Sequence, residues 1–147
     1  MRTGFARYHV EADILIDAAP DEVWRVLTDF PGYDAWNPMI TEVEGAPEKG
    51  CALSFTVTDA LGSRKRMGSR VHEIVSGKRL EWRGGSPLTF IGHHYYELEP
   101  EGEGTRFRHG ERYFGLAPML LKRILDARAA PLYPRLNEAL KRHLETR

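Results

Sequence analysis

The sequence predicts an α+β fold in which helices cover one face of an antiparallel sheet. Three observations indicate this: an early strand followed directly by a short helix, a middle region of about six segments that alternate apolar and polar residues, and a long helical stretch at the end of the chain. Segments that follow one another through short turns favour antiparallel pairing, and such a sheet buries one face against helices.

The composition of the 147 residues narrows the class of protein. A chain of this length is expected to fold as a single domain, here residues 1–147, with a core that needs no disulfides. The 21 basic residues balance the 21 acidic ones. This balance argues against a nucleic-acid partner and against electrostatic attraction to an anionic membrane.

No apolar run approaches the roughly 18 residues that span a bilayer, and residues 1–7 carry no apolar signal-peptide core. We therefore expect no integral membrane contact and a soluble, cytoplasmic protein. The lone Cys51 agrees with a reducing compartment and has no evident base beside it, so a nucleophilic thiol is not expected.

The first expected strand, residues 10–17, places Val10, Ala12, Ile14 and Ile16 on one face. A helix should begin at Pro20, because proline suits a first helical turn and Asp21 and Glu22 favour its positive end. Its apolar side consists of Val23, Val26 and Leu27. The segment Phe30-Pro31-Gly32 should end it, and residues 33–38 are too interrupted for another long helix.

Alternation with a period of two marks the strands that follow. One face carries Leu53, Phe55 and Val57, and a second segment repeats the pattern with Met67, Ser69 and Val71. Leu80 and Trp82 belong to a short strand after the turn Ser76-Gly77-Lys78. Two long strands, about 89–99 and 104–114, should flank a turn over residues 99–104.

This last hairpin carries the polar candidates. A turn centred between Pro100 and Gly104 predicts the opposed pairs Leu98–Thr105, Tyr96–Phe107, His94–His109, Gly92–Glu111 and Phe90–Tyr113. The other face would pair Glu97 with Arg106 and Tyr95 with Arg108, as suits solvent. The apolar face should therefore turn inward and take His94, His109 and Glu111 with it.

Four interpretations of these three side chains remain open. They could form a structural hydrogen-bonded network with buried water, orient the polar end of a bound ligand, perform general acid–base chemistry, or hold a metal ion. No metal-ligand spacing such as H-E-x-x-H occurs, so no metal and no cofactor is expected.

The chain resembles a known superfamily in three places. These are Ile16-x-Ala18-Ala19-Pro20-x-Glu22-Val23-Trp24 continuing to Leu27-x-Asp29-Phe30-x-x-Tyr33-x-x-Trp36-Asn37-Pro38, then Gly92-x-His94-x-Tyr96-x-Leu98-x-Pro100 with Gly104-Thr105-x-Phe107-x-His109-x-Glu111-x-x-x-Gly115, and finally Asn137-Glu138-Ala139-Leu140-Lys141. The sequence is similar to the START-like (SRPBCC) superfamily, and more narrowly to its polyketide cyclase/dehydrase and lipid-transport group.

The resemblance implies a helix-grip fold, in which a curved antiparallel sheet wraps a long C-terminal helix and two short helices follow the first strand. It also implies a hydrophobic tunnel for lipids, polyketides or other apolar molecules. Some relatives catalyse cyclisation or dehydration, some carry ligands, and some act through protein contacts, so no catalytic residue is transferred. Trp24 and Asn37-Pro38 are expected to build the corner between helix and strand.

The expected terminal helix, residues 118–145, contains two interior prolines. Pro134 lacks the N–H that would bond to the carbonyl of Ala130, and Pro131 lacks the one for Ala127. A kink or break near residues 127–134 is therefore expected. We favour a bend that follows the sheet over a hinge that opens above a pocket.

The leading hypothesis is a protein that binds a small hydrophobic or aromatic ligand in an internal cavity of about 300–1,000 Å³. The expected ligand-binding residues are Trp36, Phe55, Met67, Ser69, Trp82, Phe90, His94, Tyr96, Phe107, His109, Glu111 and Tyr113. The alternative is a cyclase or dehydratase in which His94 or His109 is the general base and Glu111 orients it. A third is a protein-interaction module with a filled interior; the oligomeric state stays open.

Overall fold

The computed structural model describes residues 8–86 and 90–146, and seven of its strands form one antiparallel sheet in the order β1-β7-β6-β5-β4-β3-β2. The strands are β1 (Tyr8–Ile16), β2 (Ile40–Glu44), β3 (Ala52–Thr58), β4 (Arg64–Val75), β5 (Arg79–Ser86), β6 (Phe90–Glu101) and β7 (Gly104–Phe114). The helices are α1 (Pro20–Thr28), the 3-10 helix η1 (Phe30–Ala35), α2 (Ala117–Leu120), α3 (Lys122–Arg128) and α4 (Leu132–Glu145). Residues 1–7 and position 89, on which sequence-based expectations fell, lie outside the described residues.

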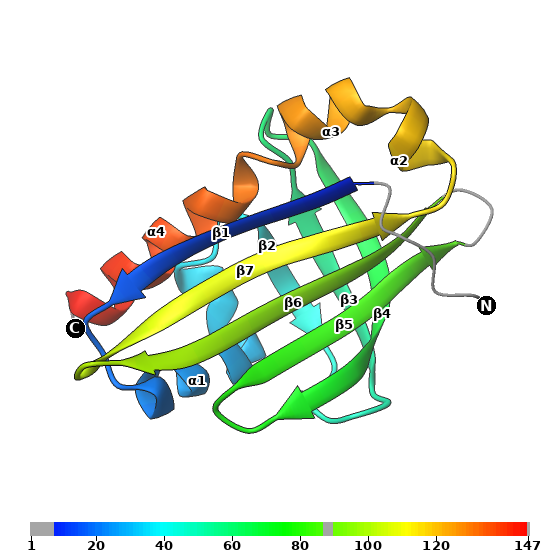
Figure 1. Ribbon diagram of the computed structural model, residues 1–147. Coiled ribbons are helices and arrows are strands. Elements are labelled where there is room, and N and C mark those ends of the chain that lie inside the picture. Colours follow the sequence, from blue (N-terminus) through cyan, green and yellow to red (C-terminus); the bar gives the residue numbers. More distant parts are fainter. Residues whose placement is uncertain (1–7, 87–89, 147) are drawn as a thin grey trace.

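The sheet curls around α4, which runs alongside β1, while α1 lies below the same concave side (Figure 1). This is the predicted α+β fold in the helix-grip form that the family resemblance implied. The concave face and α4 share the core, because the alternating residues of the strands meet the apolar stripe of the helix. From α4, the buried residues are Leu132, Tyr133, Leu136, Asn137, Leu140 and Leu144.

The segment between β1 and β2 follows the sequence expectations closely. Proline opens α1, and Val23, Val26 and Leu27 are its buried residues. At the end of η1, the side-chain oxygen of Asn37 accepts hydrogen bonds from the backbone N–H groups of Met39 (2.9 Å) and Ile40 (2.8 Å). The prediction that Asn37 builds the corner between helix and strand is therefore confirmed.

The register of the β6–β7 hairpin differs by two residues from the prediction. Glu101 pairs with Gly104, so the turn contains only Gly102 and Glu103, and His94 lies opposite Glu111 while Tyr96 lies opposite His109. The predicted pairs His94–His109 and Gly92–Glu111 are wrong, because the strands continue into the segment that was taken for a six-residue turn. An even shift leaves every side chain on its predicted face.

Tyr95 corrects a second expectation, because it was placed on the solvent face and is 0% exposed. The guanidinium groups of Arg79 and Arg112 lie over its ring, 5.2 Å and 4.9 Å from the centroid. Its hydroxyl donates a hydrogen bond to Glu11. Long arginine side chains thus bury an aromatic ring on the convex face, a covering that a period-two pattern does not indicate.

The C-terminal region is three helices rather than one. The expected break falls at residues 129–131, between α3 and α4, and a further interruption at Leu121 separates α2 from α3. Leu121, at the interruption, and Ile124 of α3 are 44% and 50% exposed. In the described part of the chain, no helix has both the length and the apolar character needed to cross a membrane.

Candidate functional site

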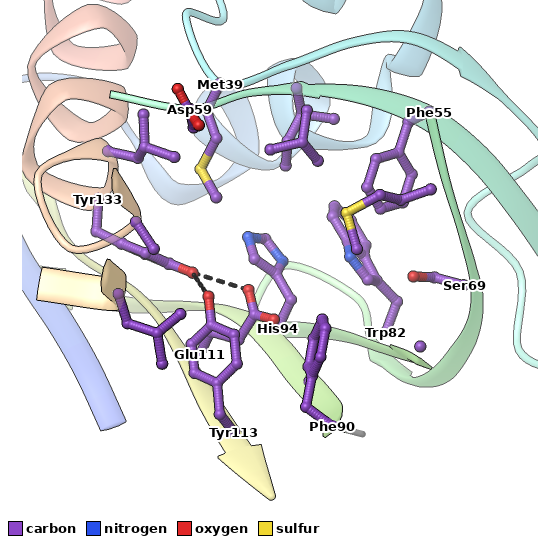
Figure 2. A pocket seen from close by; sticks show the side chains of 18 of the residues that line it. Met39, Phe55, Asp59, Ser69, Trp82, Phe90, His94, Glu111, Tyr113 and Tyr133 are labelled. Atoms are coloured by element: carbon purple, nitrogen blue, oxygen red, sulfur yellow. Dashed lines mark hydrogen bonds between the residues drawn. The ribbon is translucent and has the colours of Figure 1, made fainter. Parts of the chain in front are cut away.

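A cavity of about 180 Å³ lies between the concave face of the sheet and the helices α3 and α4 (Figure 2). The strands supply most of its wall through alternate residues, which face inward because of the pleat. Helices α3 and α4 close the remaining side with residues that lie before and after the break between them. The lining residues are Met39, Ile40, Phe55, Val57, Asp59, Met67, Ser69, Trp82, Gly84, Phe90, Gly92, His94, Glu111, Tyr113, Leu125, Arg128, Ala129, Leu132 and Tyr133.

The carboxyl group of Glu111 occupies space that a glycine leaves open. A Cβ atom added to Gly92, on the neighbouring strand β6, would lie 2.1 Å from Oε2 of Glu111. Any larger residue at position 92 would therefore displace the carboxyl group. Gly92 and Glu111 both line the cavity, so this pair of positions sets where the carboxyl group sits in it.

The hydroxyl groups of Tyr133 and Tyr113 continue a series of hydrogen bonds that begins at the same carboxyl group (Figure 2). The hydroxyl of Tyr133 donates to Oε1 of Glu111 at 2.8 Å, and the hydroxyls of Tyr113 and Tyr133 are 3.0 Å apart. Burial raises the pKa of Glu111 to about 7, and the hydrogen bond from Tyr133 opposes that rise. Burial and the nearby Glu111 also hold the pKa values of both tyrosines well above their ordinary value. The carboxyl group can therefore gain or lose a proton near neutral pH, whereas the tyrosines stay protonated.

His94 and His109 form a buried pair rather than two separate cavity groups. They are 2% and 0% exposed, and their Nε2 atoms are 2.7 Å apart. The ring of His94 also stacks on Trp82, with centroids 4.3 Å apart. Desolvation holds the pKa of His94 well below its ordinary value, and the neighbouring His109 lowers it further.

Burial lowers the pKa of His109 to about 3, opposed by the backbone carbonyl of Tyr133 and the side chain of Asn137. Both rings are consequently neutral at pH 7, and one Nε2–H donates to the lone pair of the other Nε2. Neither histidine is poised to exchange a proton near neutral pH, which the general-base interpretation would require.

The other charged groups of the cavity neutralise each other. Nη1 of Arg128 lies 3.1 Å from Oδ2 of Asp59, so this ion pair joins α3 to the loop after β3 at the cavity rim. Among residues 8–86 and 90–146, no cluster of three or more His, Cys, Asp or Glu side chains has an arrangement that could hold a metal ion.

The structure brings together two-thirds of the residues expected to contact a ligand. Those that line the cavity are Phe55, Met67, Ser69, Trp82, Phe90, His94, Glu111 and Tyr113. Tyr96, Phe107 and His109 lie in the packed core behind the wall. Trp36 lies in a separate open groove, where its ring stacks on His143 with centroids 6.0 Å apart.

The helical wall of the cavity was missed from the sequence, and Tyr133 is its most consequential member. Its position does carry a signal, because Tyr133, Leu136, Asn137 and Leu140 recur at the spacing of one helical face and are all buried. The contributions of Arg128 and Ala129 carry no such signal, since Arg128 ends α3 and Ala129 lies in the break that follows it. The cavity is also smaller than the range expected for a drug-sized ligand.

Comparison with known proteins identifies the family that the chain matches. The family model described as "Polyketide cyclase / dehydrase and lipid transport" matches residues 7–145. No curated protein matches the chain.

Solved structures resemble this one at low sequence identity, so they support the fold alone. The Zhui aromatase/cyclase from Streptomyces is 20% identical with a TM-score of 0.78, and the match covers 95% of this chain and 94% of that one. A protein from Thermus thermophilus is 19% identical with a TM-score of 0.75, covering 95% and 98% of the two chains. A START superfamily protein from Mycobacterium smegmatis is 16% identical with a TM-score of 0.75, covering 94% and 97%.

Proposed function

Because the chain belongs to the polyketide cyclase/dehydrase and lipid-transport family, we propose that it binds a compact hydrophobic or aromatic molecule in the cavity between the sheet and α3–α4. One observation carries this proposal: the wall is mostly apolar and aromatic, and a few polar groups converge within it, foremost the carboxyl group of Glu111. Binding sites for small molecules commonly combine these two properties.

The cavity volume limits the size of the ligand. An engineered apolar cavity of about 150 Å³ in another protein accommodates benzene. The present cavity of about 180 Å³ therefore suits a molecule with one ring and a short substituent. A long-chain lipid would exceed this volume.

The proposal is tested by native mass spectrometry and tryptophan fluorescence with a panel of one-ring, two-ring and long-chain apolar compounds. Trp82 is a reporter because it lines the cavity. The variant Ser69→Phe places a large ring into the cavity and should abolish binding of the one-ring compounds. Ser76→Phe adds the same ring at an exposed turn and should bind like wild type. If no compound binds to wild type, or if Ser69→Phe binds as well as wild type, the proposal is wrong.

A second candidate is catalysis of an aldol cyclisation with dehydration, which the cavity carboxyl group favours. With a pKa near neutrality, Glu111 is suited to take a proton from carbon and later return it to a departing hydroxyl. The base assignment considered from the sequence, His94 or His109, is weaker because both rings are held neutral with pKa values far below 7.

Heptane-2,6-dione is a suitable probe, since it closes to 3-methylcyclohex-2-enone with loss of one water and the product absorbs in the ultraviolet. We expect Glu111→Gln to remove any turnover and Glu99→Gln, an exposed carboxylate on the same hairpin, to retain it. Turnover that survives in Glu111→Gln would contradict this assignment.

A further inference from the structure

We propose that the cavity selects a neutral molecule whose carbonyl-type oxygen accepts a hydrogen bond from the protonated carboxyl group of Glu111. Binding is then linked to retention of that proton. The inference rests on the proposed binding function and specifies the chemical class of the ligand and the pH range in which it is held.

The two oxygens of the carboxyl group have different surroundings. Oε1 accepts the hydrogen bond from Tyr133, as the carbonyl oxygen of a neutral acid does. Oε2 lies where Gly92 has no side chain, and no partner for it occurs among the described residues. The proton therefore belongs on Oε2, the oxygen at the cavity wall, which leaves an O–H donor for a bound molecule.

Among residues 8–86 and 90–146, no unpaired cation near Glu111 compensates a negative charge there. The titratable or charged groups around it are Tyr133 of α4, Tyr113 of β7, His94 and His109 behind the wall, Tyr8 of β1 beyond Tyr113, and the ion pair of Arg128 with Asp59. Of these, Arg128 alone carries a positive charge, and Asp59 already neutralises it. An ionised Glu111 would thus be an isolated charge in apolar surroundings, in agreement with its pKa of about 7.

The polar groups of the site favour an acceptor over a cation as ligand. The hydroxyl of Tyr133 is engaged with Glu111, and Tyr113 lies at hydrogen-bond distance from Tyr133. Within this series of hydrogen bonds from Tyr113 through Tyr133 to Glu111, the donor that remains free is the Oε2–H group of Glu111. A carbonyl oxygen completes the series without creating a buried charge, whereas an ammonium ligand would require the carboxylate form first.

Three probes of nearly equal shape separate these chemistries: acetophenone as the acceptor, 2-phenylpropene as its carbonyl-free analogue, and 1-phenylethylamine as the cation. Affinities are measured by calorimetry at pH 5.5 and pH 8.5. At pH 5.5, acetophenone should bind about 2- to 12-fold more tightly than 2-phenylpropene, the range that one neutral hydrogen bond supplies. At pH 8.5, where Glu111 is ionised, this advantage should disappear.

Two variants connect the effect to Glu111. Glu111→Gln keeps a hydrogen-bond donor that does not titrate, so the preference for acetophenone should persist at pH 8.5. Glu111→Met removes the donor, so acetophenone and 2-phenylpropene should bind equally at both pH values. Circular dichroism of both variants verifies that they are folded.

The outcomes separate this inference from the proposed function. Equal binding of acetophenone and 2-phenylpropene to wild type at pH 5.5 overturns the inference and leaves the cavity function intact. Tighter binding of 1-phenylethylamine than of acetophenone at pH 8.5, lost in Glu111→Gln, also overturns it, because the carboxylate would then be the binding form. If none of the probes binds, the proposed function and the inference fail together.

Discussion

The carboxyl group of Glu111 shows how a residue on a neighbouring strand, Gly92, helps to set the surroundings in which a side chain titrates. Gly92 contributes empty space, and the mostly apolar cavity wall removes part of the water contact that would stabilise a carboxylate. Both conditions favour the protonated acid, and they account for the pKa of about 7.

The stability of the protein should depend on the protonation of Glu111. Its pKa rises from 4.5 in the unfolded chain to about 7 in the fold. The native state therefore binds the proton more tightly, and the stability from this group is fully present below pH 4.5 and lost as pH rises through about 7. A rise of this size corresponds to about 3 kcal/mol. Between pH 4.5 and pH 8, Glu111→Gln should gain about that much stability relative to wild type.

Urea unfolding of wild type and Glu111→Gln across this pH range measures the difference in their free energies of unfolding. Contributions from other titrating groups that the two proteins share cancel in this difference. His94 and His109 act in the opposite direction, because their pKa values are lowered in the fold and their contribution is lost as pH falls below 6.5. A stability difference that stays constant with pH would show that Glu111 titrates normally.

At the scale of elements, the β6–β7 turn determines which residues meet across the hairpin. Gly102 has a φ of +60° and open space around its Cα, so a side chain there meets backbone strain alone. Gly102→Ala should reduce the free energy of unfolding by about 1 kcal/mol. Glu103→Ala, at the other turn position, should change it by less than about 0.5 kcal/mol. Thermal or urea unfolding measures both, and equal effects would contradict the role assigned to Gly102.

The start of α4 explains why its prolines are tolerated. Pro131 precedes the helix, and Pro134 lies in its first turn, where backbone N–H groups have no acceptor within the helix. Pro134→Ala should therefore change stability by less than about 1 kcal/mol. Glu138→Pro, at an exposed position in the second turn, should cost about 3 kcal/mol or more. Similar losses from the two substitutions, measured by urea unfolding, would place Pro134 in the helix interior instead.

Across the whole molecule, the packing is uneven. None of the α3 side chains is buried; Ile124 within it is 50% exposed, and Leu116 and Leu120 just before it are 60% and 75% exposed. By contrast, α4 is anchored by six buried residues. The region that closes one side of the cavity is therefore the least firmly packed part of the described helices.

Hydrogen exchange should reveal this difference directly. Amides of α3 are expected to exchange much faster than those of the middle of α4. A one-ring ligand should slow exchange in α3, because Leu125 and Arg128 line the cavity. The control is Ser69→Phe, whose blocked cavity should remove the ligand effect. Equal protection of α3 and α4 without ligand would contradict this account.

Particular residues show how far the sequence predicts the site. The inward positions of Phe55, Trp82, His94 and Glu111 follow from alternation, which survives even the two-residue register error in the hairpin. The pairing of His94 with Glu111 could be predicted only with the correct length of the turn. Residues 99–104 are all polar, glycine or proline, so the sequence did not indicate that only two of them form the turn. The burial of Tyr95 depended on arginines from two other strands.

The sequence by itself determined which side chains share a face of each element, because alternation and helical spacing are local properties of the backbone. It thereby predicted an α+β fold with an antiparallel sheet covered on one face and most of the sheet side of the cavity, while the helix-grip architecture was implied by the family resemblance. Only the tertiary structure decided that Tyr133 bonds to Glu111, that His109 lies behind the wall, and that the cavity has a volume of about 180 Å³. Those features depend on how α3 and α4 pack across the sheet. Contacts between residues that are distant in the chain decide this packing.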